Sequence, residues 1–151
     1  MSINEKRVAA VADFIDKFEA STDPELWLKL CNEEANETIE ALGNLLKETA
    51  DLAYVLTGMF IACGKDAAKM EAKLKQMEHI DLVVNIIEDV LEGMPPQLFE
   101  EAYDEVHESN MSKLDTDGKP VKRSDGKILK GPNYKAPDMI ALIKEYFGKN
   151  T

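Results

Sequence analysis

The sequence contains few of the residues from which zinc, iron and redox sites are usually built. Among 151 residues there are two cysteines and two histidines. Cys31 and Cys63 lack the close spacing of zinc-binding pairs, and each lies in an apolar helical pattern. We therefore expect buried free thiols in a reduced compartment and no zinc site.

Long apolar segments are also missing. The longest stretch, Leu52–Cys63, has twelve residues, whereas a membrane-spanning helix needs about 20. The first residues carry charges where a signal peptide would require an apolar stretch, so nothing indicates export. These absences predict a cytoplasmic protein with no membrane partner. The length fits a single domain over residues 1–151.

Positive charge is scarce overall but is concentrated in one place. The net charge of −11 argues against nucleic acid as a partner. Residues 113–135 nevertheless hold seven basic and three acidic side chains, a local balance of +4, which leaves −15 on the remainder. A cationic segment on an acidic body favours binding of an anion. A solvated loop with lysines that aid solubility is the alternative.

Apolar residues recur at helical spacing along most of the chain and predict an all-α fold, an antiparallel bundle of about five to six helices. Ser2 and Glu5 form a capping box for the first helix. Pro24 opens the second helix, which we expect to end near Gly43. A third helix is predicted over about 45–63.

The second half of the chain predicts further helices and one irregular segment. A long fourth helix has a possible break near His79, and a fifth helix follows the paired prolines near residue 95. The helical period stops after Lys113. Asp117-Gly118 and Asp125-Gly126 are tight-turn signals, so a short basic β-hairpin or loop is expected near the C-terminus. Pro137 precedes a short last helix.

Two pairs of carboxylates fall among the apolar residues of the predicted second and third helices. Glu34 and Glu37 form one pair and Glu48 and Asp51 the other, each pair three residues apart on one helix face. Antiparallel helices would bring the four together, where repulsion and lost hydration are unfavourable. No basic residue is expected on that face. An all-oxygen set without His or Cys favours Mg²⁺, or alternatively Mn²⁺.

Two other interpretations of these residues were considered. Acid pairs at this spacing are common in charged helices, and most are simply solvated, so that interpretation stays open. A ferritin-like di-iron bundle would require two Glu-x-x-His pairs. His79 and His107 are instead preceded at that spacing by Gln76 and Asp104, so the di-iron pattern does not fit.

The carboxylates also form a motif. Residues 33–37, EEANE, followed by residues 48–51, ETAD, resemble the EExxE…ExxD signature of the MazG-like all-α NTP pyrophosphatases. This superfamily includes phosphoribosyl-ATP pyrophosphohydrolases, dimeric dUTPases and dCTP pyrophosphatases. Residues 105–113, 125–134 and 137–138 are similar to the branch labelled phosphoribosyl-ATP-pyrophosphohydrolase-like. Ten residues separate the two motif halves, fewer than is usual, and the stretch from about 66 to 94 is longer than in compact members.

The resemblance implies roles for individual residues. The magnesium ligands would be Glu34, Glu37, Glu48 and Asp51. Glu33 would activate water or support the ligands. The residues implied in contacting the phosphate chain or the nucleotide are Asn110, Lys113, Lys127 and Lys130, with Tyr134 a weaker candidate.

The implied activity is magnesium-dependent cleavage of the α–β phosphoanhydride of a nucleoside triphosphate, giving a monophosphate and pyrophosphate in nucleotide-pool housekeeping. On family grounds the substrate would be a deoxynucleotide, dUTP or dCTP. Relatives are dimers or tetramers, and the apolar Leu52–Cys63 helix independently favours a homodimer or homotetramer because it must be covered on every side. The alternatives are phosphoribosyl-ATP as the substrate, or a non-catalytic helical protein that binds a nucleotide or metal.

Overall fold

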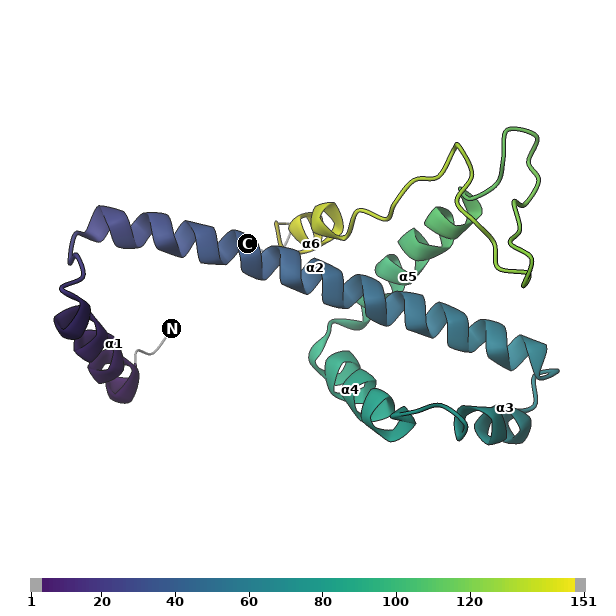
Figure 1. The fold of residues 1–151 in the computed structure, drawn as a ribbon, viewed down its shortest axis with the longest axis horizontal. Coiled ribbons are helices and arrows are strands. Elements are labelled where there is room, and N and C mark those ends of the chain that lie inside the picture. The colour runs from purple at the N-terminus through teal and green to yellow at the C-terminus, as the bar shows by residue number, and fades with distance from the viewer. Residues whose placement is uncertain (1–3, 149–151) are drawn as a thin grey trace. The chain divides into compact units, whose positions relative to one another are not determined.

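The computed structural model describes residues 4–148, and these form six α-helices and no β-strand (Figure 1). The helices are α1 (Glu5–Phe18), α2 (Pro24–Ala62), α3 (Ala67–Leu74), α4 (Ile80–Gly93), α5 (Pro96–Met111) and α6 (Met139–Gly148). The predicted all-α class is confirmed for the described residues. None of their helices is long and apolar enough to span a membrane. The chain divides into two compact units, residues 1–39 and 40–151, with the boundary inside α2.

The first unit contains α1 and the start of α2. Asn4 caps α1, its side chain accepting a 2.9 Å hydrogen bond from the backbone N–H of Lys6. The predicted cap, Ser2, lies outside the described residues. At the start of α2 the Asp23 side chain accepts from the backbone N–H of Glu25 at 3.1 Å, and Pro24 occupies the first helical position as predicted.

The prediction of separate second and third helices is wrong, because α2 is one helix of 39 residues. The expected turn at Gly43 does not form, and this glycine is not among those with positive φ. A methyl group on Gly43 would lie 3.4 Å from Ile140 Cγ1 and 3.7 Å from Met139 Cβ. These are ordinary van der Waals distances, so α6 lies directly over this part of α2. The packing of α6 helps to offset the roughly 1 kcal/mol by which glycine disfavours a helix relative to alanine.

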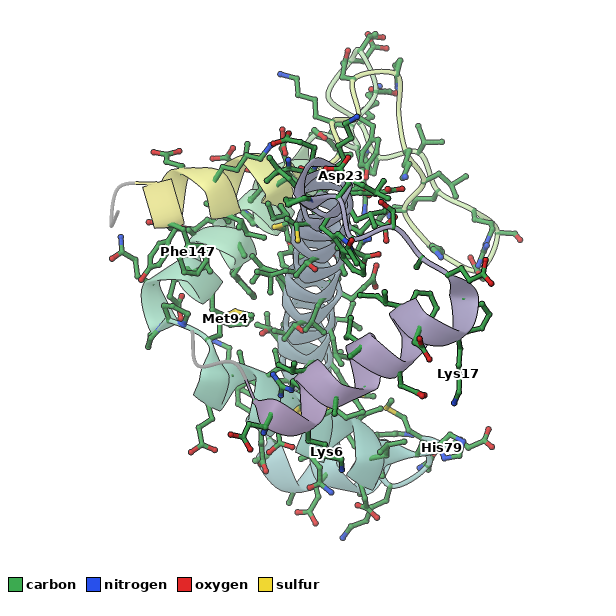
Figure 2. All side chains as sticks on the ribbon, turned by 90° about the vertical axis from the view of Figure 1, so that its left-hand side faces the viewer. Lys6, Lys17, Asp23, His79, Met94 and Phe147 are labelled. Carbon is green, nitrogen blue, oxygen red and sulfur yellow. The ribbon has the colours of Figure 1, made fainter. Side chains whose placement is uncertain are left out.

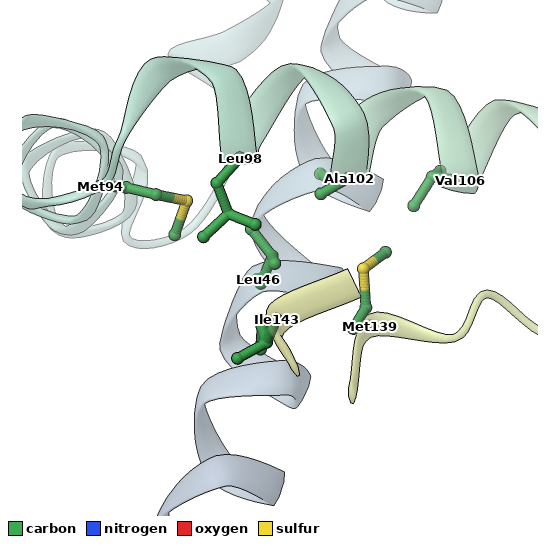
Figure 3. Close-up of a cluster of buried hydrophobic side chains, with 8 residues drawn as sticks. Leu46, Met94, Leu98, Ala102, Val106, Met139 and Ile143 are labelled. Atoms are coloured by element: carbon green, nitrogen blue, oxygen red, sulfur yellow. The ribbon is translucent and has the colours of Figure 1, made fainter. Parts of the chain in front are cut away.

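The core of the second unit is a cluster of eight buried apolar side chains from α2, α5, α6 and Met94, which lies between α4 and α5 (Figure 3). They are Leu46, Ala50, Met94, Leu98, Ala102, Val106, Met139 and Ile143. The four from Met94 to Val106 recur every fourth residue, so they share one face of α5. That face meets Leu46 and Ala50 of α2, which places one side of α2 against α5 and α6.

Two predicted helix ends are confirmed. Gly64, with φ of 72°, follows the end of α2. His79, with φ of 63°, separates α3 from α4 and is exposed (Figure 2). The expectation of two buried thiols is only partly met: both are free, but Cys31 is exposed and Cys63 is half-buried. Cys31 is exposed because none of the described residues 4–39 is buried.

The predicted β-hairpin is reduced to two turns. Gly118 and Gly126, with φ of 73° and 89°, occupy the predicted turn positions. Each turn is flanked by one isolated antiparallel bridge, Leu114 with Pro120 and Lys122 with Ile128. Proline has no backbone N–H with which to extend a ladder, so strands do not develop at the first bridge.

Candidate functional site

The three predicted site residues of the first unit lie on α2 and are all exposed. They are Glu33, Glu34 and Glu37. Glu34 and Glu37 are one turn apart and share a side of the helix. The Glu34 backbone carbonyl also accepts a 2.7 Å hydrogen bond from the Thr38 hydroxyl. Local geometry therefore presents this first carboxylate pair to solvent on one helix face.

The second carboxylate pair is bound to a basic side chain that the sequence analysis missed. The ammonium of Lys47 lies 2.8 Å from Glu48 Oε1 and 2.8 Å from Asp51 Oδ2. Hydrogen bonds to Asp51 and then Glu48 raise the pKa of Lys47, against a smaller opposing effect of burial. The expectation that this face lacks a basic residue is wrong, because Lys47 reaches back across one turn to Asp51.

The second pair lies on the side of α2 that faces away from α5 and α6. Successive helix residues are rotated by about 100°, so Glu48 is about 160° around the helix from both Leu46 and Ala50. Leu45 and Val55 accompany the carboxylates and are 43% and 65% exposed. The apolar surroundings that were predicted for this pair are present, but they are uncovered.

Among the described residues no three His, Cys, Asp or Glu side chains are grouped to hold a metal ion. Both carboxylate pairs belong to the single helix α2, so the prediction that they lie on two separate antiparallel helices is wrong. The ligand set itself stays a prediction.

A cationic group forms where α5 ends, and it contains four of the predicted substrate-binding residues. Lys113 donates a hydrogen bond from its ammonium to the Asn110 side-chain oxygen. The backbone N–H of Gly131 donates to the Lys113 carbonyl at 3.0 Å. The ammonium of Lys130 lies 4.2 Å from the centre of the Tyr134 ring, a cation–π contact. We call Asn110, Lys113, Lys130 and Tyr134 the cationic cluster.

Gly131 sets the position of this loop. A methyl group at Gly131 would lie 2.6 Å from the Leu114 carbonyl oxygen and 2.7 Å from that of Lys113. Such contacts are shorter than side chains tolerate, so the close approach of the two backbone segments requires glycine. The loop that carries Lys130 and Tyr134 is thereby held against the end of α5.

Two serines that the sequence analysis did not single out fasten the same loop. The Ser109 hydroxyl, on a residue that is 8% exposed, donates to the Lys135 carbonyl at 2.8 Å. The backbone N–H of Lys135 donates to the Ser112 hydroxyl at 2.8 Å. Both serines lie in residues 105–113, one of the segments on which the family resemblance was based. That resemblance was the feature of the sequence that could have identified them.

The residues around Tyr134 shift the pKa of its hydroxyl. Burial raises its pKa, but hydrogen bonds with Ser109 and Lys130 and the charges of Lys130 and Lys113 outweigh that effect. The pKa of Tyr134 is therefore below its ordinary value of 10.0. A hydroxyl that is acidified by neighbouring cations indicates a locally positive potential, which suits a phosphate group.

Lys127, also predicted to bind substrate, belongs to a different turn. Its backbone N–H donates to Asp125 Oδ1 at 3.1 Å. Asp125 also pairs with Arg123, 2.6 Å from the guanidinium Nη2. The hydrogen bond from Arg123 and then that from the Lys127 backbone lower the pKa of Asp125. The backbone of Lys127 therefore helps to close this turn, and the binding role predicted for its side chain stays a prediction.

An aromatic group lies beside the cationic cluster. The Tyr54 hydroxyl and His107 Nδ1 are 3.1 Å apart, and the Tyr54 and Tyr103 ring centres are separated by 5.7 Å. His107 and Asn110 are three residues apart on α5, so they share a face of that helix. Half-buried rings next to cations offer a stacking surface for a base.

A sequence model of the phosphoribosyl-ATP pyrophosphohydrolase family matches residues 3–78, about half of the chain and the part that contains both carboxylate pairs. The chain therefore belongs to the phosphoribosyl-ATP pyrophosphohydrolase family. Members of this family are pyrophosphohydrolases, hydrolases that act on phosphoric anhydrides. The resemblance predicted from the motif is confirmed. No curated protein and no solved structure matches the chain.

Proposed function

We propose that this protein is a magnesium-dependent pyrophosphohydrolase that cleaves the α–β phosphoanhydride of a nucleoside triphosphate to a monophosphate and pyrophosphate. The observation that carries the proposal is the family match, because residues 3–78 include both halves of the carboxylate motif. The cationic cluster supports the same proposal, because Lys113 and Lys130 are held near Tyr134 and create a local positive potential that suits a phosphate chain.

The donor set fits a hard divalent cation. Glu48 and Asp51 already converge on one cation, the ammonium of Lys47, with 2.8 Å to each. Four carboxylates and no nitrogen or sulfur ligand suit magnesium, with manganese as the alternative. The residues that would hold it are Glu34, Glu37, Glu48 and Asp51. When bound, the ion would neutralise phosphate charge and make the attacking water more acidic.

The remaining chemistry is assigned to the protein's own groups. Glu33, the first acid of the first motif half, would accept the proton of the water that attacks the α-phosphorus. Lys113 and Lys130 would bind the phosphate chain and stabilise the negative charge that develops on the departing pyrophosphate. Asn110 would orient the nucleotide through hydrogen bonds. Positioning and electrostatics provide most of the catalysis in reactions of this kind.

A deoxynucleoside triphosphate such as dUTP or dCTP is the proposed substrate, with the housekeeping of nucleotide pools as the role. Phosphoribosyl-ATP is the second candidate, and the observation in its favour is the description of the family that matches. Both substrates present an α–β phosphoanhydride to the same groups.

The test is a panel of deoxynucleoside and nucleoside triphosphates and phosphoribosyl-ATP, each with Mg²⁺, with separate assays for pyrophosphate and orthophosphate. We expect pyrophosphate. In heavy-oxygen water, label should enter the nucleoside monophosphate and not the pyrophosphate. Orthophosphate with a nucleoside diphosphate as first products would overturn the proposed chemistry. Binding without turnover would identify a nucleotide-binding protein instead.

A further inference from the structure

Residues 131–138 form a strap that joins the basic loop to the start of α6 (Figure 1). At one end of the strap the backbone N–H of Gly131 donates to the Lys113 carbonyl, just beyond the end of α5, at 3.0 Å. At the other end the backbone N–H of Asp138 donates to Glu105 Oε1 on α5, at 3.1 Å. Both ends of the strap are therefore attached along α5, and one member of the cationic cluster lies between them.

The covalent chain alone does not fix the position of this strap. Its seven residue steps can span about 24 Å when they are extended. The stretch between Glu105 and Lys113 is only about 12 Å long, because a helix rises about 1.5 Å per residue. The strap is thus about twice as long as the distance that it covers along α5, so contacts within the strap must decide where its side chains lie.

Two serines of α5 hold the strap at Lys135. The Ser109 hydroxyl, which is buried, donates to the Lys135 carbonyl at 2.8 Å, and the Lys135 backbone N–H donates to the Ser112 hydroxyl at 2.8 Å. The Ser112 hydroxyl donates its own hydrogen to the Ser109 carbonyl at 2.7 Å, so its oxygen is oriented to accept. Both backbone polar groups of Lys135 are thereby paired, in a segment that has no regular secondary structure.

This anchor extends to the cationic cluster through Tyr134, the residue before Lys135. Ser109 also hydrogen-bonds with the Tyr134 side chain. The Tyr134 ring in turn carries the Lys130 ammonium 4.2 Å from its centre. The position of Lys130 therefore depends on the ring, and the position of the ring depends on the strap.

The other cation of the cluster is held in a different way. Lys113 donates to the side chain of Asn110, which belongs to α5, so it does not depend on the strap. We propose that Ser109 and Ser112 are positioning residues, which place Lys130 by fixing the backbone of the strap. A phosphate chain that binds both lysines would then require the two serines. The phosphate role of the cluster rests on the proposed function, whereas the positioning does not.

The test is a double-mutant cycle between Ser112 and each lysine. Ser112→Ala, Lys130→Gln, Lys113→Gln and the two double variants are made, and ultraviolet titration follows the ionisation of Tyr134, with Tyr134→Phe to assign the signal. Calorimetry measures the binding of inorganic pyrophosphate without nucleotide or added metal. Ser112→Thr, which keeps the hydroxyl, tests rescue. Ser124→Ala, at an exposed serine of the basic loop, is the matched control.

In the wild-type background, Lys130→Gln should raise the pKa of Tyr134 and weaken pyrophosphate binding about two- to five-fold, the effect of one partly exposed charge pair. Ser112→Ala should produce both changes by itself, and the addition of Lys130→Gln should then change neither further. Lys113→Gln should keep its full effect on pyrophosphate in both backgrounds. Ser112→Thr and Ser124→Ala should resemble the wild type.

Four results would overturn the proposal. Lys130→Gln has the same effect with and without the Ser112 hydroxyl, so that Ser112 contributes only to stability. Ser112→Ala also removes the effect of Lys113→Gln, which would indicate general loosening of the cluster. Lys130→Gln leaves the Tyr134 pKa of the wild type unchanged. Ser112→Thr behaves like Ser112→Ala.

Two further measurements keep the test decisive. Circular dichroism checks folding, and Ser112→Cys, which has a similar volume but forms only weak hydrogen bonds, replaces Ser112→Ala if that variant unfolds. A wild type that binds no pyrophosphate and hydrolyses no nucleotide would contradict the proposed function. The titration of Tyr134 would still decide whether the serines position Lys130.

Discussion

Lys47 and Asp51 form an ion pair one turn apart on α2, with 2.8 Å between Nζ and Oδ2, and the same ammonium is 2.8 Å from Glu48. The ammonium binds the oxygens that are proposed to hold magnesium, so the two cations compete. The raised pKa of Lys47 keeps it charged at every pH at which the enzyme would work.

Replacing Lys47 should therefore tighten metal binding. A partly exposed ion pair of this kind contributes about 0.5–1 kcal/mol, so Lys47→Gln should lower the manganese Kd about two- to five-fold. Titration followed by paramagnetic resonance measures the effect. Lys75→Gln is the matched control, since Lys75 pairs with Glu71 at 2.7 Å on the short helix α3. An unchanged or weaker affinity in Lys47→Gln would contradict competition.

Magnesium or manganese should raise the thermal stability of the protein, because an ion that binds only the folded chain stabilises it by about 2.7 kcal/mol at a concentration one hundred times its Kd. Glu34→Gln and Glu48→Gln should each lose most of that gain. Glu40→Gln, an acid of the same helix outside the proposed set, should keep it. Melting curves with and without metal measure the difference. Equal responses in all three variants would rule out these ligands.

Tyr134 should ionise at lower pH than an ordinary tyrosine. Lys130→Gln should return its pKa toward 10.0, because the hydrogen bond and charge of Lys130 are among the causes of the lowered pKa. A lowered folded-state pKa contributes stability above the unfolded pKa, and this contribution disappears as the pH falls through the folded value. Ultraviolet titration of the four tyrosines, with Tyr134→Phe to assign the signal, provides the measurement.

Gly131→Ala should destabilise the loop of the cationic cluster. The added methyl group would meet two carbonyl oxygens at 2.6 and 2.7 Å, and overpacking of this kind costs about 1–3 kcal/mol. The Tm should fall and KM should rise as Lys130 moves away from Lys113. Gly93→Ala, where nothing lies within 4 Å of the new methyl group, is the control. A Gly131→Ala protein with native Tm and KM would show that this close approach is unimportant.

The protein should form at least a dimer, because apolar side chains of the segment 52–63 are uncovered within one chain: Val55 is 65% exposed and Ile61 is 59% exposed. Sedimentation of the unmodified protein should give at least twice 16.9 kDa. A monomer at micromolar concentration would contradict the prediction.

Local signals predicted much of the fold. Helical periodicity correctly predicted the all-α class. Glycine correctly predicted the end of α2 at Gly64 and the turns at Gly118 and Gly126, and φ is positive at all three. The error at Gly43 has a physical cause. Glycine is a stop signal by propensity, but here α6, which lies nearly one hundred residues further along the sequence, packs over Gly43 and supports the helix at this position. Tertiary packing of that kind leaves no local trace.

The site was predictable to the extent that its residues are neighbours in sequence. Asn110 and Lys113 are three apart on α5 and do interact. Lys130 and Tyr134 are four apart in a loop and also meet. The contact of Lys47 with Asp51 follows the same rule, since the two residues are four apart on one helix, and sequence spacing alone was enough to predict it. The serine contacts with Lys135 join distant segments, and spacing could not reveal them.

The contact between Gly43 and α6 ties the last helix of the chain to α2. Ile140 and Met139 lie over Gly43, and Met139 and Ile143 belong to the core. A chain truncated before Pro137 would therefore lose two of the eight buried apolar side chains and leave the core side of α2 partly uncovered. Such a chain should melt at a lower temperature than the full chain.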